Sequence, residues 1–209
     1  MNSAARQQLF ERLHAANPEP RGELAHRNAF ELLVAVILSA QATDKSVNAV
    51  TPALFRAAPD PAAMVALGAA GIERHIQTIG LFRSKAKHLV ATCRILLDEH
   101  AGEVPRGQAD LEELPGVGRK TANVVRNIAF GEPTIAVDTH VFRVANRTGL
   151  APGKTPLEVE TKLLQRVPAG YRRHAHHWLI LHGRYVCMAR RPRCAECALI
   201  DICDFKTKT

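Results

Sequence analysis

The chain has 209 residues, 46% of them hydrophobic, which is enough for one domain or two small ones with a real core. Its formal net charge of +8 favours a polyanionic partner, while an aromatic content of only 5% argues against a surface that stacks many single-stranded bases. The longest apolar run, Leu32–Leu38, is far shorter than the roughly 20 residues of a membrane-spanning helix, and the polar N-terminus lacks a signal-peptide core. We therefore expect a soluble intracellular protein with no membrane partner.

Apolar periodicity predicts helices along the first half of the chain, separated by proline and glycine. Residues 1–16 are expected to form a short amphipathic helix, and residues 30–39 a helix that is apolar on nearly all faces and therefore buried at the centre of a bundle. After a polar turn, Asp44 should cap the next helix and Pro52 should kink or split it. Further helices, each followed by a glycine, are expected at 61–67, 72–78 and 84–100.

The stretch at 114–125, LPGVGRKTANVV, predicts a very tight reversal between two helices, because Gly116 and Gly118 tolerate positive φ and the proline presets the entry. The N–H groups of such a hairpin, with the positive end of the next helix behind them, suit one phosphate. Arg119 and Lys120 lie in the first turn of that helix, where the macrodipole disfavours cations. An external anion or a chemical task would explain them, and a plain hairpin with solvated charges is the alternative.

Three more helices complete the chain, and no stretch alternates convincingly as a strand, so the predicted fold class is all-α. Asp138 should cap a helix that ends near Thr148, with Gly149 beyond it. Residues 155–158, Thr-Pro-Leu-Glu, form a capping box with proline in the first turn. The last helix, 171–186, holds the only tryptophan of the chain.

Four of the five cysteines lie near the C-terminus with the spacing C-x6-C-x2-C-x5-C. Four thiolates in one short loop can bind zinc or an iron–sulfur cluster, and the spacing by itself does not decide between them. The crowding suits a reducing compartment and a metal better than disulfides. The fifth cysteine, Cys93, lies on an apolar helix face and is expected in the core. The candidate metal ligands are Cys187, Cys194, Cys197 and Cys203.

Taken together, LPGVGRKTANVV, the segment TIAVDTH at 134–140 and the cysteine tail resemble the endonuclease III family, bifunctional DNA glycosylases and AP lyases of the helix-hairpin-helix superfamily. The resemblance runs from FELLVAVILSAQATD near the start to the last cysteine. It implies two helical domains with a DNA-binding cleft between them. A six-helix domain of residues 23–132 would contain the hairpin, and residues 1–22 plus 133–209 would form a discontinuous domain whose cysteine loop binds a [4Fe–4S] cluster.

By this resemblance Lys120 and Asp138 are the catalytic residues. The lysine amine would attack C1′ of a damaged nucleotide and form a Schiff base, and β-elimination would then break the strand on the 3′ side. A free lysine is almost fully protonated at neutral pH, and burial together with the helix N-terminus would oppose that charge. Asp138 would stabilise positive charge that develops on the sugar. A phosphate-binding Lys120 and a merely capping Asp138 are the alternatives.

The resemblance also implies which residues hold the DNA. A glycosylase rotates its target base out of the duplex, and Gln41 and Leu81 would fill the gap, with His140 near the lesion. Leu81 could instead be a core leucine, and His140 a surface residue. Arg83 departs from the small amide that relatives often carry near this wedge, which bears on contacts to the opposite strand and on lesion range. Phosphate contacts are expected from Gly116, Val117, Gly118 and Arg119 of the hairpin and from Arg190, Arg191 and Arg193 between the first two cysteines.

The expected function is base-excision repair of double-stranded DNA, with removal of oxidised pyrimidines such as thymine glycol and cleavage at abasic sites. We expect a monomer in the cytoplasm, associated with the nucleoid as in bacteria. A glycosylase with another lesion preference is one alternative. Adenine-excising relatives, however, need a carboxylate where this chain reads VAVIL, and mismatch-thymine relatives usually carry tyrosine at the position of Lys120. A non-catalytic DNA-binding module is the other alternative, and the presence of both Lys120 and Asp138 argues against it.

Overall fold

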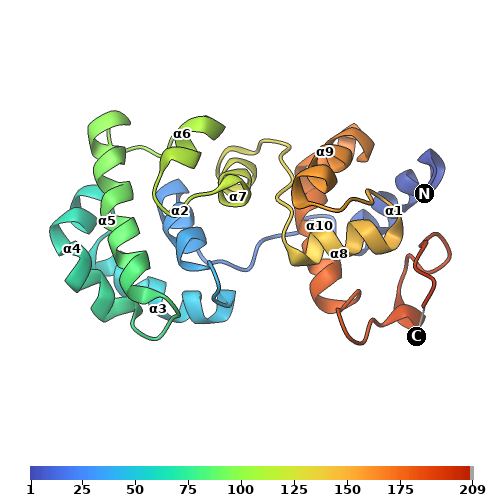
Figure 1. Cartoon of the computed structure of the whole chain (residues 1–209), viewed down its shortest axis with the longest axis horizontal. Coiled ribbons are helices and arrows are strands. Elements are labelled where there is room, and N and C mark those ends of the chain that lie inside the picture. The colour runs from blue at the N-terminus through green and yellow to red at the C-terminus, as the bar shows by residue number, and fades with distance from the viewer. Residues whose placement is uncertain (208–209) are drawn as a thin grey trace. The chain divides into compact units, whose positions relative to one another are not determined.

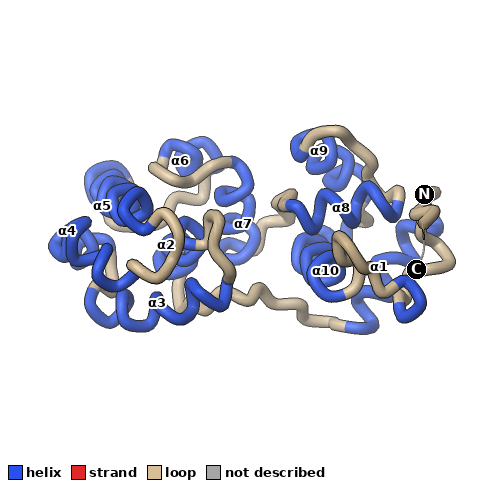
Figure 2. Tube along the Cα trace, turned by 60° about the horizontal axis from the view of Figure 1, so that its bottom comes forward, coloured by secondary structure: helices blue, strands red, loops and turns tan. Residues whose placement is uncertain are grey.

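The computed structural model describes residues 1–207 and divides the chain into two compact units (Figure 1). One unit, called the hairpin unit below, is Glu23–Phe130; the other, the cysteine unit, combines Met1–Gly22 with the chain from Gly131 onward. Across residues 1–207 all regular elements are helical and no strand occurs (Figure 2), which confirms the predicted all-α class. None of the helices in this described part is long and apolar enough to cross a membrane.

The hairpin unit is built around α2, whose residues are buried on every face from Phe30 to Leu38. Because α2 has no polar face to turn toward water, it can form only where other helices surround it. Its N-terminus is capped by Asn28, whose side chain accepts from the N–H of Glu31 at 2.9 Å. The helices of this unit are α2 (Ala29–Leu38), α3 (Asp44–Ala57), α4 (Pro61–Ile76), α5 (Phe82–Glu99), α6 (Gln108–Glu113) and α7 (Arg119–Phe130).

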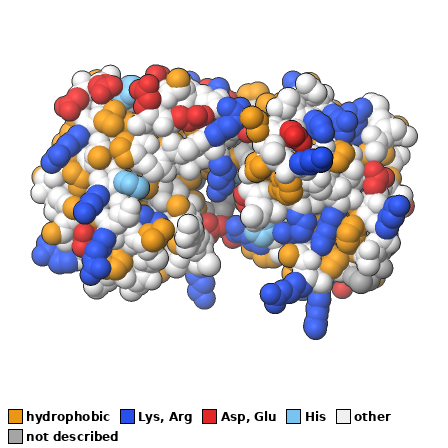
Figure 3. Space-filling model, in the orientation of Figure 1, with side chains coloured by type: hydrophobic (Ala, Val, Ile, Leu, Met, Phe, Trp, Pro, Cys, Tyr) orange, Lys and Arg blue, Asp and Glu red, His pale blue; other side chains and the backbone are white. Residues whose placement is uncertain are grey.

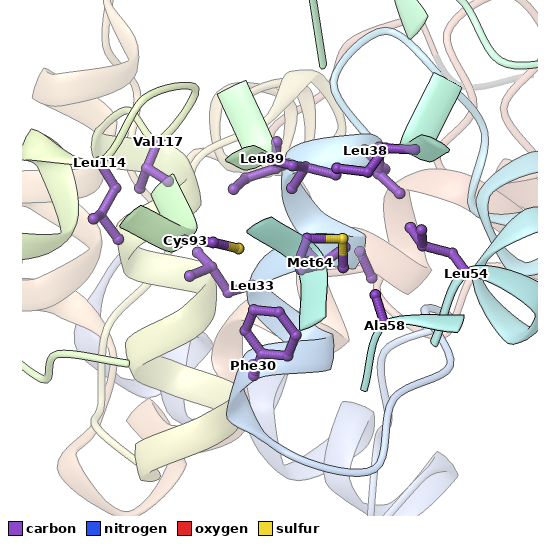
Figure 4. Packing of buried hydrophobic residues seen from close by; sticks show 14 of the residues in the cluster. Phe30, Leu33, Leu38, Leu54, Ala58, Met64, Leu89, Cys93, Leu114 and Val117 are labelled. Atoms are coloured by element: carbon purple, nitrogen blue, oxygen red, sulfur yellow. The ribbon is translucent and has the colours of Figure 1, made fainter. Parts of the chain in front are cut away.

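A single cluster of apolar side chains holds these helices together (Figure 4). Leu33 of α2 and Leu89 of α5 meet Leu114 and Val117 from the segment between α6 and α7. Cys93 lies in the same cluster with no exposed surface, and burial, aided by the charge of Asp60, raises the pKa of its thiol to about 12. The prediction that Cys93 belongs to the core is confirmed.

Two details of α3 differ from the sequence-based expectation. The N-cap is Thr43, not Asp44: the Thr43 hydroxyl oxygen accepts from the N–H of Ser46 at 3.2 Å, and Asp44 is already the first helical residue. The helix also continues through Pro52 without splitting, because the opposite face is held in the core by side chains such as Leu54. Tertiary packing therefore outweighs the loss of one backbone hydrogen bond at the proline.

Of the next two helices, α4 breaks where the sequence predicts and α5 begins earlier than predicted. Gly68, with φ 67° and ψ 170°, interrupts the helical conformation inside α4 where the sequence predicted an end. In contrast, α5 begins at Phe82, two residues before the predicted start at Ser84. The residue in front of it, Leu81, has a left-handed backbone conformation.

The cysteine unit packs α8 against α10, with α1 completing its core. Phe10 of α1 lies against Trp178, and the indole N–H of Trp178 donates to the carbonyl of Asn17 at 2.8 Å, which fixes the N-terminal segment. Thr155 caps its helix as predicted, by accepting from the N–H of Glu158 at 3.2 Å. The helices here are α1 (Ser3–Ala16), α8 (Thr139–Thr148), α9 (Pro156–Arg166) and α10 (Arg172–Tyr185), with short 3-10 turns at Ala169–Tyr171 and Cys194–Glu196.

Candidate nucleic-acid interface

The hairpin between α6 and α7 is a closed turn. The N–H of Val117 donates to the carbonyl of Leu114 at 2.9 Å, and Gly116 at its centre has φ 83°. Gly118 does not adopt positive φ, contrary to the expectation for both glycines; its carbonyl instead accepts from Ala122 at 2.9 Å and starts α7. Gly116 therefore supplies the left-handed reversal that a side chain would oppose, and Gly118 leads into the helix.

The hairpin rests on α5, which limits how far it can move. The Thr92 hydroxyl donates to the carbonyl of Pro115 at 3.0 Å, and a Cβ placed on Gly116 would lie 3.1 Å from the ring nitrogen Nδ1 of His88. The side chain of Val117 is buried, so this residue can offer only its backbone to a ligand, whereas Gly116 and Gly118 are exposed. The result is a rigid, exposed loop of backbone in front of a helix N-terminus, a geometry that suits a phosphate.

Arg119 and Lys120 lie in the first turn of α7, as predicted, and both are exposed. The expectation that burial would oppose the charge of Lys120 is therefore wrong for this structure. Lys120 lies at the N-terminal end of α7, toward which the positive end of the helix dipole points. The amine of Lys120 is therefore accessible to a ligand beside the hairpin.

The two residues expected to fill the gap left by an extruded base share a rare conformation. Gln41 has φ 55° and Leu81 has φ 59°, and within residues 1–207 only Ala101 joins them as a non-glycine residue with positive φ. Each such residue costs about 1–2 kcal/mol relative to ordinary backbone. The two turns also lie together, since a Cβ on Gly80 would be 3.8 Å from the carbonyl oxygen of Gln41.

Leu81 is 56% exposed, comparable with Leu157 at 54% in the cysteine unit. The alternative that Leu81 is a core leucine is therefore excluded. Gln41 is also exposed, and the next predicted contact, Arg83, lies on the surface with its guanidinium 5.1 Å from the ring centroid of Phe82. Positive φ and exposure therefore coincide at both Gln41 and Leu81.

In the cysteine unit, Asp138 caps α8 as predicted: its Oδ1 accepts from the N–H of Val141 at 2.8 Å. Its helix ends at Thr148 with Gly149 at φ 74°, also as predicted. His140, in the first turn of the helix, is half-buried, and its Nδ1 lies 3.2 Å from a guanidinium nitrogen of Arg143. The cap fixes the orientation of the Asp138 carboxylate relative to α8.

The four C-terminal cysteines line one pocket, together with His182, Leu199 and Phe205. Burial raises the pKa of the Cys197 thiol, and the neighbouring sulfurs of Cys203, Cys187 and Cys194 raise it further. Thiolates gathered in an apolar pocket repel one another unless a cationic centre binds them. Among the described residues no three His, Cys, Asp or Glu side chains are close enough to share a single ion.

Two arginines that the sequence patterns did not single out hold this loop against α8. Arg147 donates to the carbonyls of Met188 at 2.7 Å and Ala189 at 2.9 Å, and Arg143 donates to the carbonyl of Cys187 at 2.9 Å. Their spacing of four residues places them on one face of α8. That spacing was visible in the sequence, but their acceptors are backbone carbonyls about forty residues away, which no local pattern reveals.

The loop also presents the predicted cations. Arg190, Arg191 and Arg193 are exposed, and the N–H of Arg193 donates to the carbonyl of Val186 at 2.9 Å. Figure 3 shows Lys and Arg side chains on the visible face of both units. Exposed cationic side chains are therefore present on each unit, beside Asp and Glu side chains.

Comparison with known proteins supplies the context for these features. The family described as HhH-GPD superfamily base excision DNA repair protein matches residues 34–169. The chain is 59% identical to Endonuclease III of Escherichia coli (strain K12), with 100% of this chain and 99% of the relative aligned, and 56% identical to Endonuclease III of Haemophilus influenzae (strain ATCC 51907 / DSM 11121 / KW20 / Rd), again over 100% and 99%.

Solved structures agree with the sequence relatives. A non-covalent Endonuclease III–DNA complex superposes with a TM-score of 0.91 at 44% identity, covering 97% of this chain and 95% of that one. A trapped Endonuclease III–DNA covalent intermediate, an estranged-adenine complex, gives a TM-score of 0.88 at 45% identity and covers 95% of each chain. A thermostable thymine-DNA glycosylase shares the fold, with a TM-score of 0.86 at 23% identity.

Proposed function

Because this chain belongs to the HhH-GPD superfamily of base excision DNA repair proteins, and within it to the endonuclease III family, we propose that it excises oxidised pyrimidines such as thymine glycol from duplex DNA through Lys120. The chain is a DNA N-glycosylase with abasic-site lyase activity. The observation that carries the proposal is the position of Lys120: an exposed amine in the first turn of α7, directly behind the hairpin. A relative trapped as a covalent intermediate with DNA supports a nucleophilic side chain of this kind.

The proposed reaction begins when the neutral amine of Lys120 attacks C1′ of the extruded nucleotide. The glycosidic bond breaks, and the base leaves with the bonding electrons and takes up a proton. The C1′–O4′ bond of the resulting aminal then breaks, O4′ takes up the proton that the attacking nitrogen gives up, and the nitrogen lone pair completes the Schiff base between Nζ and C1′. Loss of a proton from C2′ then expels the 3′ oxygen with its phosphate, and water releases the lysine by hydrolysis of the imine. Asp138, from the cysteine unit, would stabilise the positive charge that grows on the sugar as the base departs.

We propose that the DNA contacts divide by task. Gly116, Gly118 and Arg119 would bind a phosphate near the reacting nucleotide through backbone N–H groups and charge. Gln41 and Leu81 would enter the stack, where their exposure and their strained backbone suit an inserted wedge. His140 would lie near the lesion. Arg83 would contact the DNA near the wedge. Further phosphate contacts would come from Val117 through its backbone and from Arg190, Arg191 and Arg193.

We also propose that Cys187, Cys194, Cys197 and Cys203 bind a [4Fe–4S] cluster. The four sulfurs line one apolar pocket, and their spacing along the chain is that of the cysteine tail of the endonuclease III family. A cluster of four irons would take one thiolate at each corner. When bound, the cluster would cross-link the loop and keep its three arginines in place beside α8.

The proposed partner is double-stranded DNA that contains damaged pyrimidines or abasic sites. The protein would act as a monomer, in the cytoplasm and on the nucleoid. This arrangement matches the positive charge on both units and requires no second copy to complete the set of proposed catalytic residues (Figure 3).

Borohydride trapping tests the central assignment. Wild-type protein incubated with a thymine-glycol duplex and borohydride should give a covalent adduct, because reduction fixes the Schiff base. Lys120→Gln keeps much of the length and polarity but has no nucleophilic amine, so it should bind the duplex and form no adduct. Lys87→Gln, which removes an exposed lysine from α5, is the control and should trap normally. Adduct at the wild-type level with Lys120→Gln would refute the proposal.

Metal analysis tests the cluster separately. Protein purified without oxygen should be brown and contain about four irons per chain. Stoichiometric zinc without iron would refute the cluster and leave the assignment of Lys120 untouched.

A further inference from the structure

Lys85 is a buried lysine in the hairpin unit that the proposed reaction does not use. It lies in the first turns of α5 and is only 4% exposed, and its Nζ donates to the carbonyl of Leu38 at 2.9 Å. Within residues 1–207 no carboxylate forms an ion pair with it. Burial lowers the pKa of its ammonium group. A buried cation without a partner carboxylate opposes folding unless other interactions offset its desolvation.

The hydrogen bond of Lys85 joins the two turns that carry the proposed wedge. Leu38 is the last residue of α2, and the chain reaches Gln41 three residues later. On the other side, the backbone N–H of Lys85 donates to the carbonyl of Leu81 at 3.0 Å, one helical turn away. A single residue therefore contacts the end of the helix that leads into Gln41 and the start of the helix that follows Leu81.

Electrostatics favour this position for a cation. The last carbonyls of a helix carry the negative end of its macrodipole, and a lysine there acts as a C-terminal cap. Leu38 and Leu89, one turn beyond Lys85 on α5, belong to the same apolar cluster, so the buried Lys85 side chain lies beside the apolar contact between α2 and α5 (Figure 4). In such surroundings a charged hydrogen bond is strong and well oriented.

The same face of α5 also supports the hairpin. Thr92 lies seven residues after Lys85, which is two helical turns, and donates to the carbonyl of Pro115 at 3.0 Å. Lys85 at one end and Thr92 further along thus attach both exposed functional turns to one rigid helix. Displacement of the wedge relative to the hairpin is resisted by both hydrogen bonds.

We propose that Lys85 is a positioning residue that holds Gln41 and Leu81 in their left-handed conformations, so that the wedge is formed before DNA binds. This inference rests on the proposed function, because it assigns Lys85 a part in base extrusion. Without the hydrogen bond to Leu38 the two strained turns can relax to ordinary backbone conformations, and each binding event must then restore them.

The test is Lys85→Met, which keeps the unbranched stem and removes the charge and the donor. The matched control is Lys87→Met, which removes an exposed lysine two residues along the same helix. Single-turnover excision is measured on thymine glycol paired with adenine and on thymine glycol opposite an abasic site, where there is no base pair to break. We expect Lys85→Met to excise the paired lesion about 10-fold or more slowly than wild type does. On the unpaired lesion its excision rate should be close to that of wild type. Lys87→Met should match wild type on both.

Base extrusion can also be followed without chemistry. In the Lys120→Gln background, the fluorescence of a 2-aminopurine beside the lesion should increase on binding, because the neighbouring base leaves the stack. Adding Lys85→Met should slow or reduce this increase in fluorescence. Combining Lys85→Met with Leu81→Ala should give little further loss beyond Leu81→Ala alone, because Lys85 is proposed to act through the wedge. The melting temperature of Lys85→Met should stay within roughly 5 °C of wild type, since a desolvated charge and its hydrogen bond are lost together.

The inference is overturned if Lys85→Met excises the paired lesion at a wild-type rate, or if its excision rate falls by the same factor on both substrates. It is also overturned if the loss of rate caused by Lys85→Met adds fully to the loss caused by Leu81→Ala in the double variant. Should Lys85→Met fail to fold, Lys85→Gln is compared on the paired and unpaired lesions in the same way. A selective loss on the paired lesion would then support the inference, and an equal loss or none would overturn it. Absence of excision by the wild-type protein would refute the proposed function instead, so the two failures are distinguishable.

Discussion

At the scale of single residues, Asp138 combines a structural bond with a proposed electrostatic role, and substitution can separate them. Its Oδ1 accepts from the N–H of Val141 at 2.8 Å at the start of α8. Asparagine caps a helix about as well as aspartate, so Asp138→Asn should destabilise the fold by under roughly 1 kcal/mol, mainly through the lost charge at the helix N-terminus. Excision should fall by about 10²-fold or more, because a neutral amide cannot balance positive charge on the sugar.

The measurements are a melting curve, the affinity for lesion DNA and single-turnover excision on the same Asp138→Asn protein. Binding should be unchanged or slightly tighter, since phosphates repel the wild-type carboxylate. Excision at a near-wild-type rate would reduce Asp138 to a helix cap.

His177 is predicted to make the cysteine unit less stable at acidic pH. Burial, reinforced by the charge of His174, lowers the pKa of His177 to about 4, and within the described residues its Nδ1 has no hydrogen-bond partner. The unfolded chain binds this proton near pH 6.5, so the stabilisation from the neutral folded form is complete above that pH and declines as the pH falls toward about 4. Between pH 8 and pH 5 the loss should be about 2 kcal/mol.

Denaturant unfolding at both pH values checks the prediction for His177. The variant His177→Gln should lose correspondingly less stability between pH 8 and pH 5 than wild type, whereas His26→Gln, at an exposed histidine of the hairpin unit, should behave like wild type. Equal acid sensitivity of wild type and His177→Gln would contradict the assignment.

At the scale of elements, the two hairpin glycines should respond differently to the same added methyl group. Gly116 has φ 83°, and a Cβ there would lie 3.1 Å from the His88 ring, whereas Gly118 has no atom within 4 Å of its Cβ position. Gly116→Ala should therefore destabilise the protein by about 1–3 kcal/mol. Gly118→Ala should be neutral or slightly stabilising, because it restricts the unfolded chain without straining the folded one.

DNA binding by the same two hairpin variants separates fold from contact. If the exposed face of Gly118 meets a phosphate as proposed, Gly118→Ala should weaken binding while its melting temperature is unchanged. Gly116→Ala with wild-type stability would show that the left-handed reversal is not needed, and the geometry of the turn would have to be reconsidered.

At the scale of the whole molecule, the net charge of +8 predicts strongly salt-dependent DNA binding. Cations on both units would each release counterions on contact with phosphates, so affinity should fall by at least about 100-fold between 50 and 200 mM salt. Replacing Arg190, Arg191 and Arg193 together by glutamine should reduce the magnitude of the slope of log affinity against log salt concentration by about two to three. A slope unchanged by this triple variant would remove the cysteine loop from the interface.

Much of the helical architecture was predictable because it depends on neighbouring residues. Asp138 and Thr155 cap their helices, and Gly149 ends one, since each device works within a few residues of chain. The errors occurred where packing overrides local preference. Of the two outcomes predicted for Pro52, a kink or a split, the split does not occur, because side chains on the opposite face of α3 are anchored in the core. Lys120 is exposed rather than buried, because sequence periodicity does not report how much of a helix N-terminus its neighbours cover.

The sequence by itself determined the all-α class, the central position of α2, the tight hairpin and the family, since periodicity, caps, glycine positions and motif spacing are properties of short stretches. Only the tertiary structure decided that Gln41 and Leu81 are both left-handed and that their turns lie together. The hydrogen bond from Lys85 to Leu38 spans 47 residues, and Arg147 reaches Met188 across 41. Such contacts depend on which distant segments the packed core brings together, and no window of sequence contains both partners.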